Sequence, residues 1–349
     1  MFVEYCCPKC KGEVRTINDF LSCLGCGAAW PIKEGIPCFS VGSSYWGFAS
    51  PEAMHALLQI AQNEGWLEAV KCYSDASNTH TYDYLYQYAV SEARADFQFL
   101  IPLSSQSTVL DVGCGWGNIS VSLARNTQHV VALDSTFENA KFVSVRAEQE
   151  KIHNIQTVCA DAHALPFQDD TFDLIVMNGV LEWTARDTEN RNALRVQLEV
   201  LDQIHNCLKR PGWLYLGIEN RFSIKLLCGA RDPHTGLRFG TVLPRAVGDA
   251  YSRIIRHKGY SELIHSARQL QKLLRSAGFS DAKMYFPLPG YQRIRYLLDF
   301  TALNVNRFLF QKLRSHRKFG ALATIASRFV PSLGIARCFA PCFSVVAAK

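Results

Sequence analysis

Short apolar runs alternate with longer helical stretches through the middle of the chain. Five runs are rich in Val, Ile and Leu and are bounded by polar or glycine residues, as buried strands are. This alternation predicts an α/β fold, a doubly wound parallel sheet with helices on both faces. The predicted strands are residues 107–113, 129–135, 155–162, 172–183 and 212–220.

The segments before and after these five strands show helical and strand patterns. A helix is expected to begin at Pro51, with Ser50 as its N-cap and Gly65 as its stop. A second helical segment covers residues 81–101, and the apolar run 342–349 predicts a last strand. The predicted sheet is therefore preceded by helices and completed from the far end of the chain.

Three glycines directly follow the first predicted strand, at Gly113, Gly115 and Gly117. Glycine is costly to order, so three together indicate a sharp bend or a close approach to a ligand. Asp134 ends the second strand, 23 positions after Asp111, where a carboxylate can accept hydrogen bonds from two ribose hydroxyls. The spacing G-x-G-x-G is not that of dinucleotide sites, so we expect a nucleoside with a short amino-acid arm.

The motifs "VLDVGCGWG", "VVALDS" and "ADAHALPFQDDTFDLIVMNGVLEW" resemble, in order and spacing, those of the class I S-adenosylmethionine-dependent methyltransferases. The resemblance implies a Rossmann-like sheet of seven strands, the last antiparallel, and S-adenosylmethionine as cofactor. By position, Asp111 and the three glycines would hold the methionine part and Asp134 the ribose. The remaining cofactor-binding residues implied are Asp161 and Ala162, which would meet the adenine, and Asn178.

Two departures from that family limit the chemistry. The fourth strand ends in "NGVLEW", not in the Asn/Asp-Pro-Pro-aromatic motif that holds a planar amine, which disfavours N-methylation of exocyclic base amines. Trp183 stands where many small-molecule relatives carry a histidine, so no acid-base role can be transferred from that position.

The acceptor is expected to enter at an insertion, residues 220–260, after the fifth strand. Its "ENR", "HTG" and "LPR" resemble methyltransferases of bacterial cell-surface polysaccharide assembly, which implies a saccharide hydroxyl on a lipid-linked or nucleotide-linked glycan. His234 is one candidate general base, and Glu182, just after the fourth strand, is the other. The alternative is that His234 belongs to a turn and that the strand-end residues pair locally. The candidate acceptor-binding residues are Glu219, Asn220 and Arg221.

Four of the thirteen cysteines form two C-x2-C pairs separated by twelve residues. Four thiolates with this spacing predict a tetrahedral structural zinc. With the following "WPIKEGIPCF", the stretch resembles the small zinc-ribbon family that activates RNA and protein methyltransferases, which implies a docking module and a protein partner at the ribbon. The predicted zinc ligands are Cys7, Cys10, Cys23 and Cys26.

Charge and hydropathy bear on the location of the protein. From Tyr291 onward ten basic residues face Asp299 alone, which predicts either solvated helices or contact with an anionic membrane. No apolar stretch approaches the length of about 20 residues that a membrane helix needs, and the start lacks the regions of a signal peptide. We therefore expect a cytoplasmic protein, with peripheral contact at the inner membrane face as an option.

These features divide the chain into four parts: a zinc ribbon (1–42), a linker with capping helices (43–101), a methyltransferase core (102–290), and a basic helical segment with the final strand (291–349). The predicted function is O-methylation of a saccharide.

Three alternatives remain open. The first is an RNA methyltransferase with an RNA-holding ribbon, which is disfavoured because four basic residues face four acidic ones over residues 1–40. The second is a non-catalytic cofactor-binding or partner-docking protein. The third is a quinone or lipid C-methyltransferase, which would leave the ribbon and the insertion unexplained.

Overall fold

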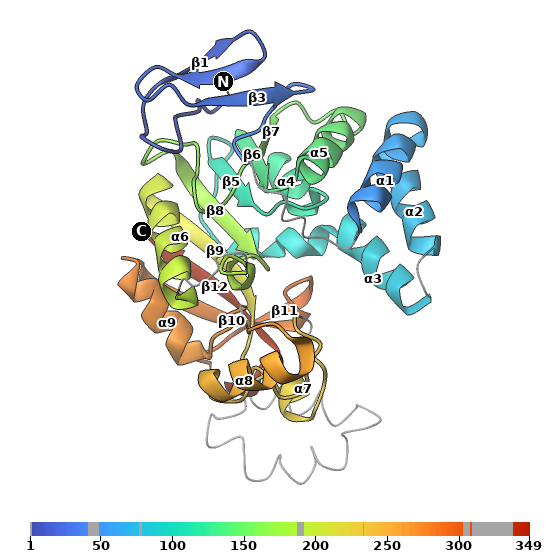
Figure 1. Cartoon of the computed structure of the whole chain (residues 1–349), viewed down its shortest axis with the longest axis vertical. Coiled ribbons are helices and arrows are strands. Elements are labelled where there is room, and N and C mark those ends of the chain that lie inside the picture. The colour runs from blue at the N-terminus through green and yellow to red at the C-terminus, as the bar shows by residue number, and fades with distance from the viewer. Residues whose placement is uncertain are drawn as a thin grey trace.

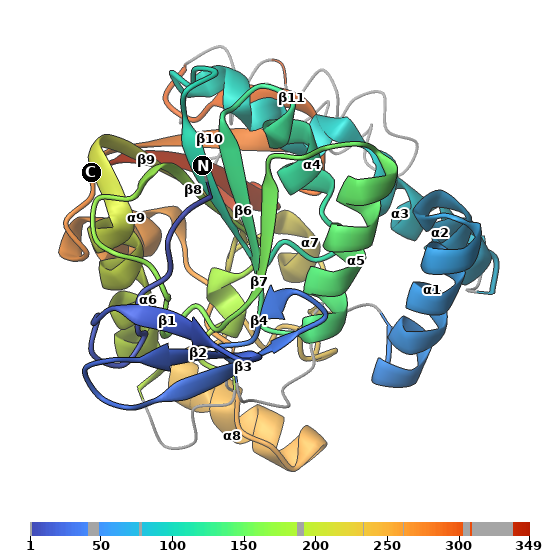
Figure 2. The ribbon, with the colours of Figure 1, turned by 90° about the horizontal axis from the view of Figure 1, so that it is seen from above.

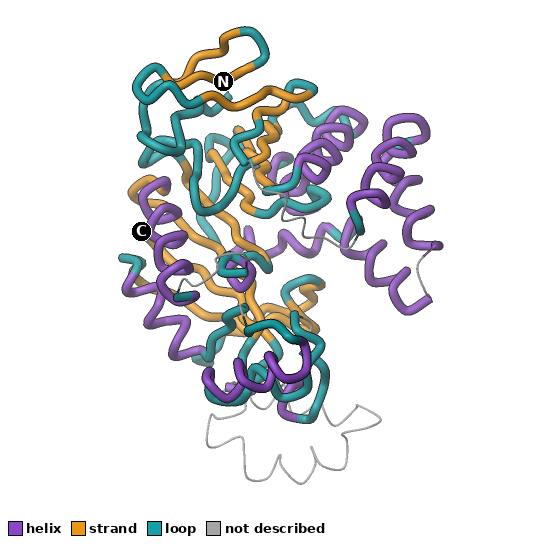
Figure 3. The backbone as a smooth tube through the Cα atoms, in the orientation of Figure 1, coloured by secondary structure: helices purple, strands orange, loops and turns teal. Residues whose placement is uncertain are grey.

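The computed structural model describes residues 2–40, 49–76, 79–186, 192–232, 234–260, 262–302, 308 and 338–349. Its largest element is a mixed sheet of eight strands in the order β11-β10-β12-β9-β8-β5-β6-β7 (Figure 1, Figure 3). The strands are β5 (Thr108–Val112), β6 (His129–Asp134), β7 (Ile155–Cys159), β8 (Phe172–Asn178), β9 (Leu208–Glu219), β10 (Ser280–Gly290), β11 (Arg293–Asp299) and β12 (Cys342–Ala348).

The five predicted strands are β5 to β9, and neighbouring members of this set pair in parallel. The predicted last strand is β12, which lies antiparallel between β9 and β10. Both predictions are confirmed. Because the carboxyl ends of parallel strands meet at one edge, the residues that follow β5, β6, β7, β8 and β9 gather there.

The prediction of seven strands was wrong by one, since β11 adds an eighth at the edge of the sheet. It pairs antiparallel with β10, joined to it by a tight turn, and was expected to belong to a helical segment. Its arginines stand on an edge strand with only one fully buried residue, Ile294, so the run lacks the continuous apolar pattern of the central strands. The rest of the basic segment, 303–307 and 309–337, lies outside the described residues.

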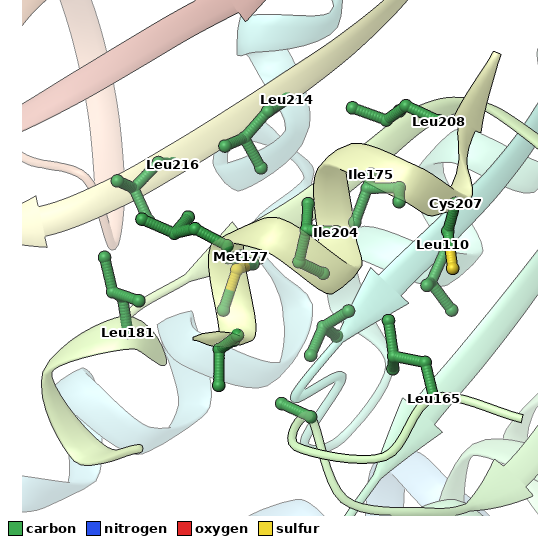
Figure 4. Close-up of a cluster of buried hydrophobic side chains, with 14 of the residues drawn as sticks. Leu110, Leu165, Ile175, Met177, Leu181, Ile204, Cys207, Leu208, Leu214 and Leu216 are labelled. Atoms are coloured by element: carbon green, nitrogen blue, oxygen red, sulfur yellow. The ribbon is translucent and has the colours of Figure 1, made fainter. Parts of the chain in front are cut away.

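Helices cover both faces of the sheet, as the doubly wound prediction requires (Figure 2). On one face α6 and α9 pack against β8, β9, β10 and β12, and on the other α4, α5 and the 3-10 helix η1 pack against the central strands. Figure 4 shows the first of these interfaces, where Ile204 of α6 lies among Leu110, Ile175 and Met177. The bounds are α4 (Asn118–Ala124), α5 (Phe137–Gln149), α6 (Ala193–Cys207), α9 (Ala267–Ser276) and η1 (Glu92–Leu100).

The helices before the sheet pack against α5 and the glycine turn. The first begins as predicted, with the Ser50 hydroxyl accepting a hydrogen bond from the Ala53 amide, and ends at Gly65. The predicted helical segment 81–101 forms the end of one α-helix followed by η1. Among the described residues no helix is both long and apolar enough to cross a bilayer. These helices are α1 (Pro51–Glu64), α2 (Trp66–Ala76) and α3 (Thr79–Val90).

The first forty residues form a separate small antiparallel sheet that docks on its own chain. Its main-chain and side-chain contacts reach the loop that follows β7: the Cys6 amide donates to the Pro166 carbonyl (2.9 Å), and the Lys11 ammonium donates to the carbonyls of Leu165 (2.9 Å) and Phe167 (3.1 Å). The ribbon is therefore continuous with the core. Its strands are β1 (Val14–Ile17), β2 (Phe20–Cys23), β3 (Ala29–Lys33) and β4 (Ile36–Pro37).

The segment predicted as an insertion contains two helices, α7 (Ile224–Leu227) and α8 (Arg245–Arg256). They lie at the bottom of Figure 1, whereas the ribbon lies at the top. The ribbon and the insertion are thus at opposite ends of the molecule.

Candidate functional site

The glycine turn after β5 has the backbone conformation that its sequence suggests. Gly113, Gly115 and Gly117 have φ of +72°, +53° and +74°, in the left-handed region that other L-residues rarely adopt. A Cβ on Gly113 would lie 2.5 Å from a methyl carbon of Val180, and one on Gly115 would lie 2.7 Å from the hydroxyl of Tyr88. The three positions therefore need glycine for both backbone and space.

Two buried carboxylates hold this turn in place. The Asp134 carboxylate accepts hydrogen bonds from the Gly115 amide (3.0 Å) and the Thr136 amide (3.0 Å), and Asp111 accepts from the Ser120 hydroxyl (2.6 Å). Burial raises the pKa of Asp111 to about 6 and raises the pKa of Asp134 as well. A carboxylate can accept about four hydrogen bonds, so Asp134 keeps acceptor capacity on the oxygen that faces the turn.

The other predicted cofactor residues follow the next strands at the same edge. Asp161 and Ala162 come just after β7, and Asp161 accepts a hydrogen bond from the His163 amide (2.9 Å). Asn178 ends β8 and is 7% exposed, yet its amide nitrogen and oxygen have no hydrogen-bond partner in the described part of the chain. A buried amide without partners is expected to meet a ligand. The donor set at this edge thus fits a nucleoside ligand.

Three residues proposed for catalysis or acceptor binding meet in one cluster. Glu182 lies in the short 3-10 helix η2 (Leu181–Trp183), Glu219 ends β9, and His234 lies in the insertion. One ligand atom from each lies within 4.8 Å of the others. The His234 Nε2 is 3.5 Å from a Glu219 oxygen, and the His234 ring packs against the ring of Trp183 with centroids 4.3 Å apart.

Burial and mutual charge set the ionisation of this cluster. Burial, then the neighbouring Glu219, raises the pKa of Glu182 well above its ordinary value. Burial alone would raise the pKa of Glu219, but the adjacent His234 outweighs it and holds that pKa below the usual range. For His234 the desolvation that lowers its pKa is outweighed by Glu219, so the pKa is raised. Glu182 therefore holds a proton more tightly than Glu219 does, and Glu219 is the charged partner of the imidazole.

Two residues that sequence reasoning missed support the cluster. The Tyr291 hydroxyl, from the turn between β10 and β11, donates to Glu219 (2.5 Å). Asp232 accepts from the His234 amide (2.9 Å) and from the hydroxyl of Tyr260 (2.8 Å), which fixes the loop that carries the histidine. Tyr291 is 72 residues from Glu219 in sequence, so no local sequence pattern predicts this contact.

Asn220 and Arg221 have polar groups already engaged with the backbone. The Asn220 amide nitrogen donates to the carbonyls of Cys338 and Ala340, both at 2.7 Å. The Arg221 guanidinium donates to the carbonyls of Thr241 (2.7 Å) and Leu243 (2.6 Å). These contacts reach distant parts of the chain rather than local ones. They favour a structural role, in which the two side chains hold the end of β9 to the segment before β12 and to the insertion.

A pocket of about 230 Å³ opens beside the cluster. Glu219 and Tyr291 form part of its wall, and the insertion adds Ser223, Lys225 and Arg231. Both cations are exposed. The pocket wall therefore carries the Glu219 carboxylate and two positively charged side chains.

The four predicted zinc ligands also converge. Sulfur atoms of Cys7 and Cys26 are 3.6 Å apart and those of Cys10 and Cys23 are 3.5 Å apart, and all four lie within 4.8 Å of one another. A zinc tetrahedron with Zn–S bonds of about 2.3 Å has edges of about 3.8 Å. The amides of Cys10 and Cys26 point to the sulfurs of Cys7 and Cys23, each at 3.4 Å. The donor set fits a closed four-thiolate zinc site.

The ribbon buries one side and exposes the other. Leu21 and Trp30 pack into the main core, whereas Ile17, Phe20 and Leu24 are exposed. The predicted protein partner at the ribbon stays a prediction.

Comparison with known proteins identifies a family that matches part of the chain. Residues 109–211 match the family described as "Methyltransferase domain". The malonyl-[acyl-carrier protein] O-methyltransferase of Marinomonas sp. (strain MWYL1) is 24% identical over 208 residues, 57% of this chain and 67% of that protein. The demethylmenaquinone methyltransferase of Listeria welshimeri is 24% identical over 222 residues, 63% of this chain and 84% of that protein. Several other relatives are matched over less than a third of their own length.

The solved structures that match this chain are similar to it only to a limited degree. A methyltransferase structure from Bacillus halodurans has a TM-score of 0.40 at 16% identity, covering 73% of this chain and 98% of that one. A complex between the Haloferax volcanii Trm112 methyltransferase activator and a methyltransferase has a TM-score of 0.44 at 14% identity, covering 83% of this chain and 96% of that one. These values decide nothing about function.

The last strand, β12, lies antiparallel in the sheet, as the sequence resemblance implied. The glycine turn and Asp134 lie at the carboxyl edge of the parallel strands, within the matched residues. The chain therefore contains a methyltransferase domain of the class I, S-adenosylmethionine-dependent kind.

Proposed function

We propose that the chain O-methylates a hydroxyl group of a saccharide. The observation that carries the proposal is the cluster formed by the buried Glu182 and the half-buried Glu219 and His234, beside a pocket. Methylation of a hydroxyl requires a group that takes up its proton, because a neutral alcohol is a weak nucleophile. A cluster of this kind at the carboxyl edge of the sheet provides such a group.

His234 is suited to receive the proton of the acceptor hydroxyl. The adjacent Glu219 raises the pKa of the imidazole, so the ring is a stronger base and its charged form is stabilised after transfer. Tyr291 fixes the other oxygen of Glu219, and Asp232 fixes the loop of His234. Glu182 is the second candidate base, and it would have to lose its own proton before it could accept one.

The charge of the pocket favours an acceptor with an anionic group. Lys225 and Arg231 lie on the wall that also holds Glu219. A phosphate near the reacting hydroxyl would pair with these cations, and both lipid-linked and nucleotide-linked saccharides carry one. Asn220 and Arg221 are not part of this proposal because their side chains hold the fold.

The cofactor would lie along the edge formed by the glycine turn. Asp111 and the three glycines would hold its methionine part, Asp134 its ribose, and Asp161 with Ala162 its adenine, while the unpartnered amide of Asn178 faces the same edge. When bound, S-adenosylmethionine supplies a methyl group on a sulfonium, and the acceptor oxygen forms a bond to that carbon as the carbon–sulfur bond breaks.

A carboxylate acceptor is the second candidate, favoured by the similarity to a malonyl-[acyl-carrier protein] O-methyltransferase. A carboxylate is already ionised at neutral pH, so its methylation would leave the cluster of Glu182, Glu219 and His234 without a use. Quinone acceptors, named for other relatives, carry no phosphate to match the cations of the pocket.

The experiment is transfer of labelled methyl from S-adenosylmethionine into three fractions of a host extract: total RNA, lipid-linked and nucleotide-linked glycans, and acyl-carrier thioesters. The Asp134→Ala protein serves as blank. Label in the glycan fraction supports the proposal. Label in nuclease-sensitive material would replace it with RNA methylation, and label in the thioester fraction with carboxyl methylation.

We further propose that Cys7, Cys10, Cys23 and Cys26 hold a structural zinc. The purified chain is expected to contain one zinc, and its removal by a chelator is expected to lower the thermal unfolding temperature, because ligand binding free energy contributes to folding. Lys11, next to Cys10, holds the loop after β7, so S-adenosylmethionine affinity is expected to fall as well.

Metal analysis and calorimetry of the Cys10→Ser protein check this prediction. Cys228→Ser is the matched control, since Cys228 is also exposed but lies outside the thiolate cluster. A chain produced in zinc-replete medium that carries no zinc would refute the site.

A further inference from the structure

Five polar atoms of the catalytic cluster have no hydrogen-bond partner among the described residues. They are both carboxylate oxygens of Glu182, the Nδ1 of His234, and two atoms that face each other 3.5 Å apart, one oxygen of Glu219 and the Nε2 of His234. Glu182 is fully buried, and the His234 side chain is 3% exposed. Burying such groups without a partner is costly. The presence of these buried polar atoms at one place indicates that the cluster binds a ligand.

The unpartnered atoms form a convergent donor set. One oxygen from each carboxylate and one imidazole nitrogen lie within 4.8 Å of one another. Two ligands on opposite sides of a cation with bonds of about 2.1 Å stand about 4.2 Å apart, so a small inward movement would close the set. Tyr291 donates to the other oxygen of Glu219. The oxygen left for a cation is the one that faces the His234 Nε2, and a bound cation would replace that contact.

We propose that Glu182, Glu219 and His234 bind a divalent cation. Two carboxylates and one imidazole suit a cation that accepts oxygen and nitrogen ligands, such as Mn²⁺, whereas the thiolates of the ribbon suit zinc. On binding, Glu182 would release its proton, and the cation would neutralise the two carboxylates. The three ligands come from η2, β9 and the insertion, so the cation would also tie these elements together.

The position of the site suggests what the cation does. Glu219 lines the pocket, so an acceptor oxygen in the pocket could complete the coordination. A bound cation lowers the pKa of an oxygen ligand, so the acceptor hydroxyl could lose its proton to solvent water. In that form His234 would act as a ligand and not as the base. This role rests on the proposed function, whereas binding of the cation does not.

The test is Mn²⁺ binding to the purified full chain, followed by electron paramagnetic resonance and titration calorimetry without any acceptor. We expect one Mn²⁺ per chain outside the ribbon, and we expect Glu182→Gln and His234→Ala each to weaken binding at least about tenfold. Glu262→Gln is the matched control. Glu262 is a buried glutamate of the same region, but its carboxylate is not a member of the donor set, so Mn²⁺ binding should persist.

Circular dichroism and thermal unfolding establish that each variant is folded, and the Glu182→Gln substitution keeps the side-chain volume. A wild-type chain that binds no Mn²⁺ overturns the proposal and assigns the neutralisation of the carboxylates to protons. Binding that Glu182→Gln leaves unchanged also overturns it, because the cation would then lie elsewhere. Methyl transfer that proceeds without any divalent cation would remove the catalytic role but would not affect the proposed methylation.

Discussion

The Asp134→Ala protein is expected to show no binding of S-adenosylmethionine in titration calorimetry at concentrations that saturate the unaltered chain. Asp134 ends β6, and its carboxylate is the group proposed to accept hydrogen bonds from two ribose hydroxyls. A hydrogen bond to a charged group contributes about 1.5–3 kcal/mol, so loss of two weakens binding by about a hundredfold or more. The same change removes the acceptor of the Gly115 amide and loosens the glycine turn.

Two further variants separate these contributions. Asn139→Ala removes a side chain that donates to the same carboxylate (3.2 Å) but has no proposed contact with the cofactor, so only a modest loss of affinity is expected. Asp134→Asn keeps the shape and one acceptor oxygen, and should bind with intermediate affinity. If Asp134→Ala, shown to be folded, binds the cofactor as the unaltered chain does, the ribose assignment is wrong.

The His234→Ala protein is expected to lose about a hundredfold or more in turnover, the range of a lost general base, while its affinity for S-adenosylmethionine stays unchanged. The reason is the placement of the ring, next to Glu219 and the pocket but on the insertion rather than on the glycine turn. Initial-rate kinetics with the acceptor identified by label transfer, together with calorimetry for the cofactor, measure the two quantities separately.

His205→Ala is the control for this variant. His205 is a partly buried histidine in the last turn of α6, next to Phe279 and outside the described cluster, and its loss should leave turnover close to that of the unaltered chain. Unchanged turnover in His234→Ala would remove that residue from the mechanism and leave Glu182 as the candidate base. Equal losses in turnover and in cofactor affinity would instead indicate a structural role for the ring.

Much of the fold could be predicted because the signals are local. The central strands are short apolar runs, and β12 ends the chain in an apolar run of the same kind. The turn after β5 needs glycine at three positions because of its own backbone angles. Each of the two cysteine pairs likewise forms a tight turn within a few residues. The strand β11 was missed because an edge strand buries only part of its side chains and shows no continuous apolar pattern.

The candidate site was predictable only in part. Glu182, Glu219 and His234 were each identified from position, but separate sequence positions cannot say that three side chains meet. Asn220 and Arg221 looked equally suited to bind an acceptor, and only their hydrogen bonds to distant carbonyls show that they hold the fold.

The sequence by itself determined the doubly wound class of the sheet, the positions of its central strands, the glycine turn and the four-cysteine spacing, since each depends on residues close together in the chain. The tertiary structure alone decided that the ribbon docks on the loop after β7 and that the insertion folds back over β9. It also decided that Tyr291 reaches Glu219 across 72 residues of sequence. Contacts of this kind are set by how the sheet edge and the loops pack together, and no local periodicity encodes them.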